Sequence, residues 1–261
     1  MNTKLIESFK NREVKAKDIF VVEQINVKVA RNLITNYHYL GTKKFMITYA
    51  YGIRLTEETE YLGVAVFGQV GGGVALKGWF GLSNDHTDIL ELTRLVMNPI
   101  LNGTNATSYL LSKGIKELKK KGIRAIISLA DSSRHYGYIY QACNFGYYGI
   151  TNPKTDFYCN IDGQLKANPR MATKNVQGVW LPRTQKYRYC YIIDKELVPK
   201  YTKEEYPKGD DHIQPKCCDG THVVYDNRFN KYYTCPKCTG KLEEVPQTDA
   251  DNILNNIRRD Y

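Results

Sequence analysis

The sequence contains no long apolar segment. Its longest apolar runs, such as Ala125–Ala130, fall far short of the roughly 20 residues that cross a bilayer, and the N-terminal stretch MNTKLIESFKNREVK lacks the apolar core of a signal peptide. We therefore expect a soluble cytoplasmic protein, in the host-cell cytoplasm if a phage encodes it. Hydrophobic residues make up 42% of the 261 residues and charged residues 25%, values that exclude a disordered or fibrous chain.

Acidic residues are scarce relative to basic ones. There are 27 Asp and Glu against 37 Lys and Arg, which gives a formal net charge of +10. Such an excess favours a polyanionic partner, because phosphate neutralisation releases counterions. The 21 tyrosines add aromatic faces on which bases can stack. We expect nucleic acid, double-stranded DNA in particular, to be the partner, and the alternative is an ordinary solvated basic surface.

Cysteines are sparse except in one segment. Cys143, Cys159 and Cys190 are isolated, whereas Cys217, Cys218, Cys235 and Cys238 lie within 22 residues. Crowding of this kind is typical of metal binding and not of disulfides in a cytoplasmic protein.

The cysteine segment predicts a structural zinc site. The CPKC spacing allows Cys235 and Cys238 to reach one tetrahedral ion. Two more ligands are expected from Cys217, Cys218 and His222, with His212 near enough to replace one of them. Zinc would fold about forty residues that cannot build a core alone. This zinc-ribbon-like module can also contact DNA.

Hydrophobic periodicity predicts an α/β main domain. The expected helices span 25–40, 106–121 and 138–145, and the expected strands span 45–53, 61–69, 89–96, 123–130 and 147–150. The first two of these strands should form a hairpin. The nearly continuous apolar run at 123–130 should lie mid-sheet. Alternating strands and helices place binding sites at strand ends.

The remaining segments set the expected domain boundaries. Residues 71–73 read as a glycine loop, 151–177 show a weak pattern, and 179–197 read as a basic, aromatic strand or hairpin. The polar stretch 200–211 has the composition of a linker. We expect a catalytic domain at 1–205, a zinc module at 206–245 and a C-terminal helical tail at 246–261.

Candidate catalytic residues lie at the ends of these elements. Asp131 ends the buried strand, where it can orient an amine or cap the next turn, and His135 and Tyr140 follow it closely. Ser108 lies in the first turn of the helix after NGTNAT, where backbone amides gather an anion, although an ordinary N-terminal serine is equally expected. His38 and Tyr39 precede Gly41 at a helix end and can face a cleft or the core.

A series of blocks resembles a known family. YHYLG, YAYGIR, YLGVAVFGQ, ELTRLVMNP, NATSYLLSKGIKEL and SLADSSRHYGYIYQACNFGYYG occur in the order and spacing of the Mom family of phage DNA-modification proteins. The stretch KYRYCYIID resembles the basic C-terminal strand of that family more weakly. The resemblance implies a fold similar to GNAT acyltransferases, that is, a mixed sheet flanked by helices.

The resemblance also implies an activity. Mom proteins are implicated in placing a carbamoylmethyl group on the exocyclic amine of adenine, which shields phage DNA from restriction. Carried over to the matching positions, it assigns Asp131 and Ser108 to chemistry, Arg94 to support or anion binding and Tyr39 to the target base, with His38 and His135 in the same blocks. On this basis the chain is expected to be a DNA-modifying, anti-restriction transferase.

The expected donor site departs from the acyltransferase pattern. A standard GNAT loop reads Gln/Arg-x-x-Gly-x-Gly/Ala, whereas residues 102–107 read NGTNAT and match none of its defining positions. An acyl-CoA or a related donor therefore stays open. The candidate donor-binding residues are Asn102, Gly103, Thr104, Asn105 and Thr107.

Substrate contacts and a catalytic metal complete the expectations. Tyr140 is expected to stack on a flipped base, as is Tyr39, while Lys186 and Arg188 of the basic strand contact the DNA backbone. A metal such as iron, held by His38, Tyr39, Asp131 or His135, ranks below a metal-free site.

Two rival functions keep the same elements. One is an acyl-CoA-dependent N-acetyltransferase that acts on a hypermodified base, a polyamine or a protein. The other is an inactive GNAT-like protein that binds DNA through its zinc ribbon. The enzyme hypothesis requires Asp131 and Ser108 to meet at one cleft wide enough for a nucleobase.

Overall fold

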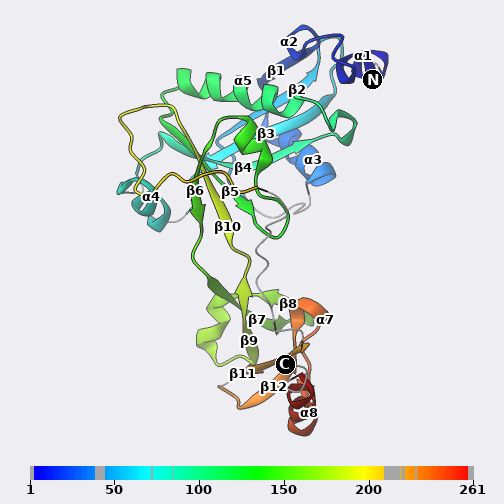
Figure 1. Ribbon diagram of the computed structural model, residues 1–261, viewed down its shortest axis with the longest axis vertical. Helices are drawn as coiled ribbons and strands as arrows, with labels where there is room; N and C mark the ends of the chain where they lie inside the picture. The colour runs from blue at the N-terminus through cyan, green and yellow to red at the C-terminus, as the bar shows by residue number, and fades with distance from the viewer. Residues whose placement is uncertain are drawn as a thin grey trace. The chain divides into compact units, whose positions relative to one another are not determined.

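A computed structural model describes residues 3–38, 45–71, 73–83, 85–208, 218, 221–226 and 228–257 (Figure 1). The chain divides into two compact units. The first comprises Met1–Ala130, Tyr136–Gly149 and Tyr187–Gly209. The second comprises Asp131–His135, Ile150–Lys186 and Asp210–Tyr261, so it includes a segment that the expected boundaries placed in the main domain.

The first unit is built on a seven-stranded sheet in the order β1-β2-β3-β4-β5-β10-β6. The strands are β1 (Phe20–Gln24), β2 (Tyr49–Leu55), β3 (Tyr61–Gln69), β4 (Ile89–Met97), β5 (Ala125–Asp131), β6 (Gly146–Ile150) and β10 (Lys186–Ile192). The first four pair antiparallel, and β4 pairs parallel with β5. A parallel pair needs a crossover connection, which a helix between β4 and β5 supplies.

Helices cover the sheet. They are α1 (Thr3–Lys10), α2 (Ala16–Ile19), α3 (Val27–Tyr37), α4 (Gly73–Phe80), α5 (Ala106–Lys120) and α6 (Tyr138–Ala142), with a 3-10 turn η1 (Pro99–Leu101). The apolar stripe of α3 packs on Ala50 and Val66, whereas Gly114 of α5 approaches Tyr51 and Phe67. Adjacent residues of a strand point to opposite faces, so α3 and α5 lie on opposite sides of the sheet (Figure 1).

The parallel strands β4 and β5 separate along their length. Pairing with β3 joins Val66 to Arg94 and Phe67 to Leu92, which leaves Thr93 as an extra residue in a β-bulge. Pairing with β5 covers only Ile89–Glu91 against Ala125–Ile127. Beyond it the hydroxyl of buried Ser128 donates to the carbonyl of Leu92 at 3.1 Å. The carboxyl ends of the two strands therefore diverge, a place where α/β sheets bind ligands.

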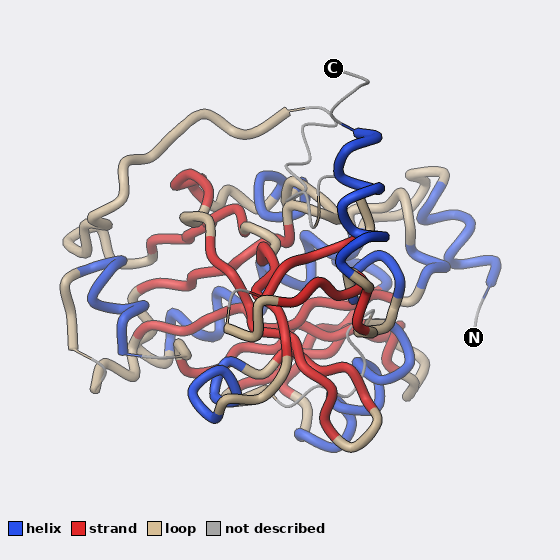
Figure 2. Tube along the Cα trace, turned by 90° about the horizontal axis from the view of Figure 1, so that it is seen from below, coloured by secondary structure: helices blue, strands red, loops and turns tan. Residues whose placement is uncertain are grey.

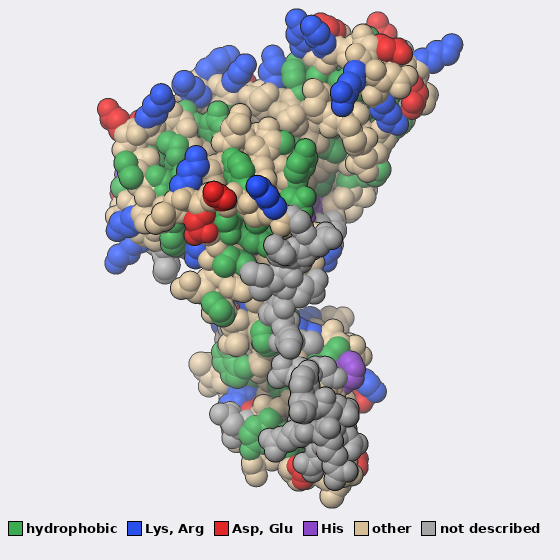
Figure 3. Space-filling view, in the orientation of Figure 1, with side chains coloured by type: hydrophobic (Ala, Val, Ile, Leu, Met, Phe, Trp, Pro, Cys, Tyr) green, Lys and Arg blue, Asp and Glu red, His purple; other side chains and the backbone are tan. Residues whose placement is uncertain are grey.

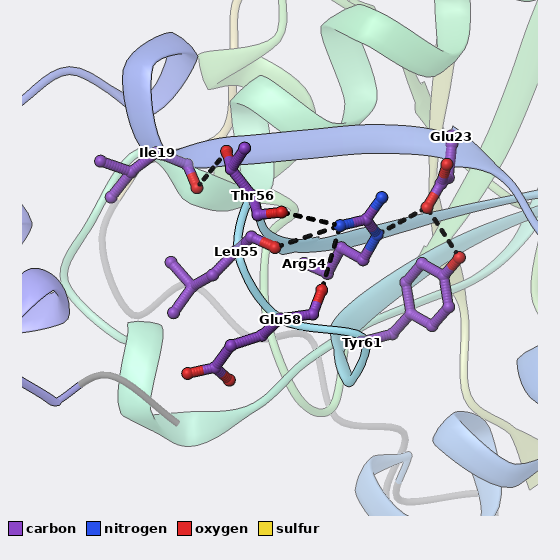
Figure 4. A network of polar contacts seen from close by, with 7 residues as sticks. All are labelled: Ile19, Glu23, Arg54, Leu55, Thr56, Glu58 and Tyr61. Carbon is purple, nitrogen blue, oxygen red and sulfur yellow. Dashed lines mark hydrogen bonds and ion pairs between the residues drawn. The ribbon is translucent and has the colours of Figure 1, made fainter.

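A polar network ties the edge of this sheet together (Figure 4). Arg54 donates through Nε to Glu23 at 2.7 Å, and the Tyr61 hydroxyl donates to the same carboxylate at 2.9 Å. The Nη1 atom of Arg54 also reaches the carbonyl oxygens of the turn that follows β2. Arg54 and Tyr61 lower the pKa of Glu23, so strands β1, β2 and β3 are joined through a carboxylate.

The second unit contains two three-stranded sheets, in the orders β8-β7-β9 and β11-β12-β13. Its elements are β7 (Lys154–Ile161), β8 (Gln164–Ala167), β9 (Gly178–Arg183), β11 (Val223–Asp226), β12 (Lys231–Thr234), β13 (Glu244–Val245), the 3-10 helix η2 (Pro169–Lys174), α7 (Pro236–Thr239) and α8 (Gln247–Ile257). Val179 and Leu181 of β9 pack against Tyr233 and Cys235, which joins the two sheets in one core. Figure 2 shows α8 as a regular helix close to the C-terminus.

The predicted mixed α/β main domain with a small C-terminal cysteine-bearing sheet is confirmed. The hairpin of β2 and β3 and the mid-sheet position of β5 are as predicted. The prediction for 179–197 was wrong where it proposed a hairpin, because β9 and β10 belong to different sheets. The weak stretch 151–177 contains strands β7 and β8, and Gly73 opens α4 instead of closing a loop. Within the described residues, no helix is long and apolar enough to span a membrane.

Candidate functional site

A hollow lies at the N-terminal end of α5. It has a volume of about 500 Å³. Gly103, Thr104, Asn105 and Ser108 line one side of it, from the loop and the first turn of α5. Three cationic side chains from the end of α1 and the turn that follows it also line the hollow: Lys10, Arg12 and Lys15. Since a helix N-terminus also carries partial positive charge, this hollow suits an anionic group.

A second hollow of about 320 Å³ adjoins the first, and the two share Asn105, Ser108 and Ala142. Its remaining lining is polar and aromatic, and includes Tyr109, Ser112, Lys116, Cys143, Asn144 and Tyr191. Burial raises the pKa of the Cys143 thiol to about 11, so this sulfur stays protonated at neutral pH and is a poor nucleophile. The second hollow therefore offers hydrogen-bonding groups and aromatic rings, but no thiolate nucleophile.

Ser108 is placed where both hollows meet. Its hydroxyl donates to the Asn105 carbonyl at 2.9 Å, which leaves its oxygen able to accept a hydrogen bond. Of the five residues predicted to bind a donor, Gly103, Thr104 and Asn105 line the first hollow, whereas Asn102 and Thr107 are not among the lining residues. Donor binding itself stays a prediction. The three cations of the α1–α2 turn were missed, because no local pattern shows that this turn lies beside α5.

Asp131 is held as a carboxylate by its neighbours. Burial raises the pKa of Asp131, but hydrogen bonds from the Lys186 ammonium and the Ser133 hydroxyl outweigh burial and lower the pKa below its usual value. Lys186 bonds to Oδ2, and the Ser133 hydroxyl donates to Oδ1 at 2.8 Å. Asp131 also begins a turn, since its carbonyl accepts from the amides of Arg134 and His135.

The turn after Asp131 is fixed to the start of β10. The Ser132 hydroxyl donates to the Gln185 carbonyl at 2.9 Å, and the Ser132 amide donates to the same oxygen at 3.2 Å. Gln185 immediately precedes Lys186, so these bonds hold the backbone at Lys186 close to the turn that follows Asp131 and support the ion pair. Lys186, predicted to contact DNA, is thus the partner of the candidate catalytic acid.

Asp131 and Ser108 belong to different units of the chain. Ser108 lines both hollows, and Asp131 is absent from the described residues that line them. The meeting of the two side chains at one cleft stays a prediction.

Arg94 lies at the bulge of β4. Its Nη1 donates to the Thr93 carbonyl at 2.6 Å, and its guanidinium lies 4.6 Å from the centre of the Phe45 ring. Glu91, three residues earlier, was missed by the sequence reasoning. Burial raises the pKa of Glu91, and the Gly71 backbone and Arg94 oppose this rise only in part. The sequence feature that could have pointed to Glu91 is its position as an acidic residue within the largely apolar stretch ILELTRLV.

Other predicted site residues have varied surroundings. Tyr39 lies outside the described residues, and His38 follows α3, where its amide donates to the Ile34 carbonyl. Tyr140 is buried, with its ring packed on Phe145 and Tyr189, a position that favours a structural role over base stacking. Arg188 lies 4.3 Å from the centre of the Tyr201 ring, and its Nη1 reaches the Tyr148 carbonyl.

Three cysteines converge in the second unit. The sulfur atoms of Cys218, Cys235 and Cys238 all lie within 4.8 Å of one another, with 3.4 Å between those of Cys218 and Cys238. The grouping does not include His222, whose side chain is exposed and whose carbonyl accepts from the Cys235 amide. Cys217 lies outside the described residues.

The cysteine grouping can hold a metal ion. Three thiolates at this spacing match three corners of the tetrahedron that zinc prefers, since zinc–sulfur bonds are about 2.3 Å long. The backbone supports the grouping, because the Thr239 amide donates to the Cys235 carbonyl at 2.9 Å and so closes the CPKC turn. The residues present therefore fit a thiolate-bound metal.

Several solved structures of acetyltransferases are similar to this chain. One is an IAA acetyltransferase from Bacillus cereus, with 14% identity over 67% of this chain and 99% of that chain and a TM-score of 0.42. A second is the ribosomal-protein-S18-alanine N-acetyltransferase from Escherichia coli, with 12% identity over 73% of this chain and 99% of that chain and a TM-score of 0.41. A third is a GNAT family acetyltransferase from Elizabethkingia anophelis with acetyl-CoA bound, with 13% identity over 67% of this chain and 98% of that chain and a TM-score of 0.39.

The family assignment is more specific. No curated protein matches the sequence. The model of the Mom protein family, however, matches residues 19–208. The chain therefore belongs to the Mom protein family, and the predicted resemblance is confirmed.

Proposed function

We propose that this protein transfers a small acyl-derived, carbamoylmethyl-like group to the exocyclic amine of adenine in DNA and thereby protects the DNA from restriction. The observation that carries the proposal is the family match over residues 19–208, which includes both Ser108 and Asp131. The charge state of Asp131 supports it, since a carboxylate can accept a hydrogen bond from an amine.

Asp131 acts on the acceptor amine. The lone pair of that amine is delocalised into the purine ring, so the amine is a weak nucleophile. A hydrogen bond to Asp131 increases electron density at nitrogen while the new C–N bond forms and the bond between the transferred carbon and the donor's leaving group breaks, so that the leaving group departs with the electron pair of that bond. Because Lys186 and Ser133 lower its pKa, Asp131 is a better hydrogen-bond acceptor than base, and the amine proton passes on to solvent.

The donor binds at the start of α5. Its anionic part lies among Lys10, Arg12 and Lys15, and the Ser108 hydroxyl orients the group that is transferred. The combined cationic and helix N-terminal environment selects a phosphate- or carboxylate-bearing donor, acyl-CoA or a relative of it. Arg94 supports the bulge of β4 and contributes positive potential beside it.

The test is product analysis. The protein is expressed in bacteria, and the DNA is digested to nucleosides and examined by mass spectrometry. We expect a new adenine derivative that disappears or falls at least about a hundredfold with Asp131→Asn. Asp162→Asn is the matched control, because Asp162 lies in the tight turn between β7 and β8. Unmodified nucleosides in cells that contain folded, soluble protein would overturn the proposal.

The cationic hollow favours one rival, an acyl-CoA-dependent N-acetyltransferase acting on another amine. Calorimetric titration with acetyl-CoA separates the two. Tight binding together with unmodified DNA would support the acetyltransferase, whereas a modified adenine nucleoside supports the DNA-modifying enzyme.

We further propose that Cys218, Cys235 and Cys238 hold a structural zinc ion, with Cys217 as the expected fourth ligand. A closed set of thiolates leaves no position for substrate, so the ion stabilises the fold of β11, β12 and α7 and takes no part in catalysis. Elemental analysis of the purified protein should give about one zinc per chain. Cys238→Ser should lower this content, while Cys143→Ala, which lies in the first unit, should leave it unchanged.

A further inference from the structure

The positive charge of the chain is concentrated in the first unit. This unit has 23 Lys and Arg against 15 Asp and Glu, whereas the second unit has 14 against 12. The cysteine-bearing unit is therefore close to electrically balanced. Since backbone affinity for DNA grows with the number of phosphates neutralised, the first unit is the better candidate for the main phosphate contacts.

Within the first unit, α5 has the clearest imbalance. Between Ala106 and Lys121 there are five lysines and one glutamate. The helix buries Leu110, Leu111, Ile115 and Leu118 against the sheet. At 100° per residue, Lys113, Lys116 and Lys120 project from the opposite side, with Lys119 beside them. Figure 3 shows basic side chains along the margin of the molecule formed by α5 and the α1–α2 segment.

Lys113, Lys116 and Lys119 form a row of lysines along α5, and acidic neighbours do not neutralise this row. Glu117 pairs with Lys120 at 2.7 Å. In the part of the chain that the structure describes, no carboxylate lies within ion-pair distance of Lys113, Lys116 or Lys119. Lys116 and Lys119 are exposed, and Lys113 lies 5.4 Å from the centre of the Tyr109 ring. None of the three ammonium groups therefore has an ion-pair partner among the described residues, an arrangement that suits a polyanion.

The row continues past the helix start. The α1–α2 turn beside the first turn of α5 carries Arg12 and Lys15, which line the larger hollow. The lysine row itself covers about 9 Å of the helix axis from Lys113 to Lys119, enough for several phosphates of a duplex, which has one charge per roughly 1.7 Å.

We propose that the outer face of α5, with Lys113, Lys116 and Lys119 at its centre, is the surface that binds the phosphate backbone of duplex DNA. This inference rests on the proposed function for its choice of polyanion. It assigns backbone binding to the outer surface of the first unit and not to Lys186, which is engaged with Asp131. The contact is not sequence-specific, because contacts to phosphates carry no information about the base sequence.

The test is duplex binding measured without any donor. Fluorescence anisotropy follows a labelled duplex at several salt concentrations for the full-length protein and for the triple variant Lys113→Gln, Lys116→Gln and Lys119→Gln. We expect the variant to bind about tenfold or more weakly at about 0.1 M salt, with the slope of log K against log salt shallower by about 0.9 for each phosphate that is no longer neutralised.

A matched control removes the same charge elsewhere in the first unit. Lys28→Gln, Lys195→Gln and Lys203→Gln replace three exposed lysines outside α5 and should leave both affinity and slope near wild type. Equal weakening by both triple variants would overturn the proposal, since net charge alone would then explain binding. Far-ultraviolet circular dichroism and a thermal melt confirm that each variant folds.

A second measurement depends on no variant. Brief acetylation with a lysine reagent, followed by peptide mass spectrometry, should show Lys113, Lys116 and Lys119 protected by duplex DNA, and Lys28, Lys195 and Lys203 not protected. Absence of protection on α5 would overturn the surface assignment. Failure of the proposed function gives a different result: the wild type then binds duplex DNA through α5, but cellular DNA contains no modified adenine.

Discussion

At the scale of single residues, the ion pair of Asp131 and Lys186 sets the charge of the candidate catalytic acid. Burial alone would raise the pKa of Asp131, and the lysine reverses this effect. The side chains are 18% and 24% exposed, so solvent screens the pair only in part. The carboxylate should therefore persist throughout the neutral range.

Lys186→Met should move the acid limb of the pH–activity profile to higher pH. Without the ammonium group, burial dominates and the pKa of Asp131 rises, so the carboxylate is lost at a pH where the wild type retains it. Nucleoside product measured between about pH 5 and pH 9 checks this, and Lys186→Arg should retain the wild-type limb. An unchanged limb in the methionine variant would mean that Lys186 does not control Asp131.

Asp226 and Arg228 form a buried pair in the second unit. The Asp226 side chain is 2% exposed, and Arg228 donates to both of its oxygens, at 3.0 and 2.6 Å. Arg228 also reaches the carbonyls of Gly178 and Ala172. The pair therefore links β11 to β9 and η2.

Arg228→Ala should destabilise the protein by about 3–5 kcal/mol near neutral pH, because it leaves a buried carboxylate without its partner. Burial raises and Arg228 lowers the pKa of Asp226, and the net pKa in the folded protein is depressed. This stabilising contribution is present above the unfolded pKa and is lost as pH falls through the folded pKa. Urea unfolding should thus show a gap between wild type and variant that narrows in acid. Adding Asp226→Asn should recover part of the loss.

At the scale of elements, the start of α6 depends on one glycine. Gly137 has φ of 84°, and a Cβ there would lie 2.4 Å from Cε2 of Tyr189 and 2.9 Å from Cδ2 of Tyr140. The residue thus combines a left-handed backbone with a close ring contact.

Gly137→Ala should cost at least about 2 kcal/mol, the sum of backbone strain and displacement of a buried tyrosine ring. Gly122→Ala is the matched control, since Gly122 has φ of 81° but nothing within 4 Å of its Cβ position. The control should show the backbone cost alone, about 1 kcal/mol. Chemical denaturation of both variants measures the difference, and equal losses would show that the ring contact adds nothing.

The elements with strong periodicity were predictable from sequence. α3, β3, β4, α5 and β5 follow apolar stripes or runs that local chemistry interprets correctly. The pairing of β10 was not predictable, because its neighbours β5 and β6 come from other parts of the chain. Strand β7 was missed because KTDFYCNI alternates weakly and buries only Phe157 and Cys159 among its residues.

The candidate site shows the same limit. Ser108 and Asp131 were proposed as candidates from their positions at helix and strand ends, and the cysteine grouping was predicted from a spacing of two residues. The role of Lys186 as a partner of Asp131 depends on a sequence separation of 55 residues and left no local signal. The cations of the α1–α2 turn are likewise brought to α5 by the tertiary fold alone.

At the scale of the whole molecule, the two units should respond differently to metal removal. If zinc is bound by Cys218, Cys235 and Cys238, a chelator should expose the backbone amides of β11, β12 and α7, because this small sheet has little apolar core of its own. The core of the first unit, with buried residues on both faces of β3 and β5, should keep its protection.

Hydrogen exchange with mass spectrometry checks this. Peptides from 223–245 should lose protection within minutes of chelation, while peptides from 61–69 and 106–120 should not change. Uniform loss across the chain would mean that the metal stabilises both units as one cooperative structure. No change at 223–245 would show that the thiolates hold no stabilising ion.

The chain passes repeatedly between the two units, at residues 130/131, 135/136, 149/150, 186/187 and 209/210. A stop codon after residue 209 would therefore not yield a clean catalytic domain. It would leave β7, β8 and β9 in place while removing Tyr233 and Cys235, against which Val179 and Leu181 pack. The truncated product would expose the side chains of Val179 and Leu181 to water and be prone to aggregate, so in this chain residues 150–186 and the cysteine-bearing tail depend on each other.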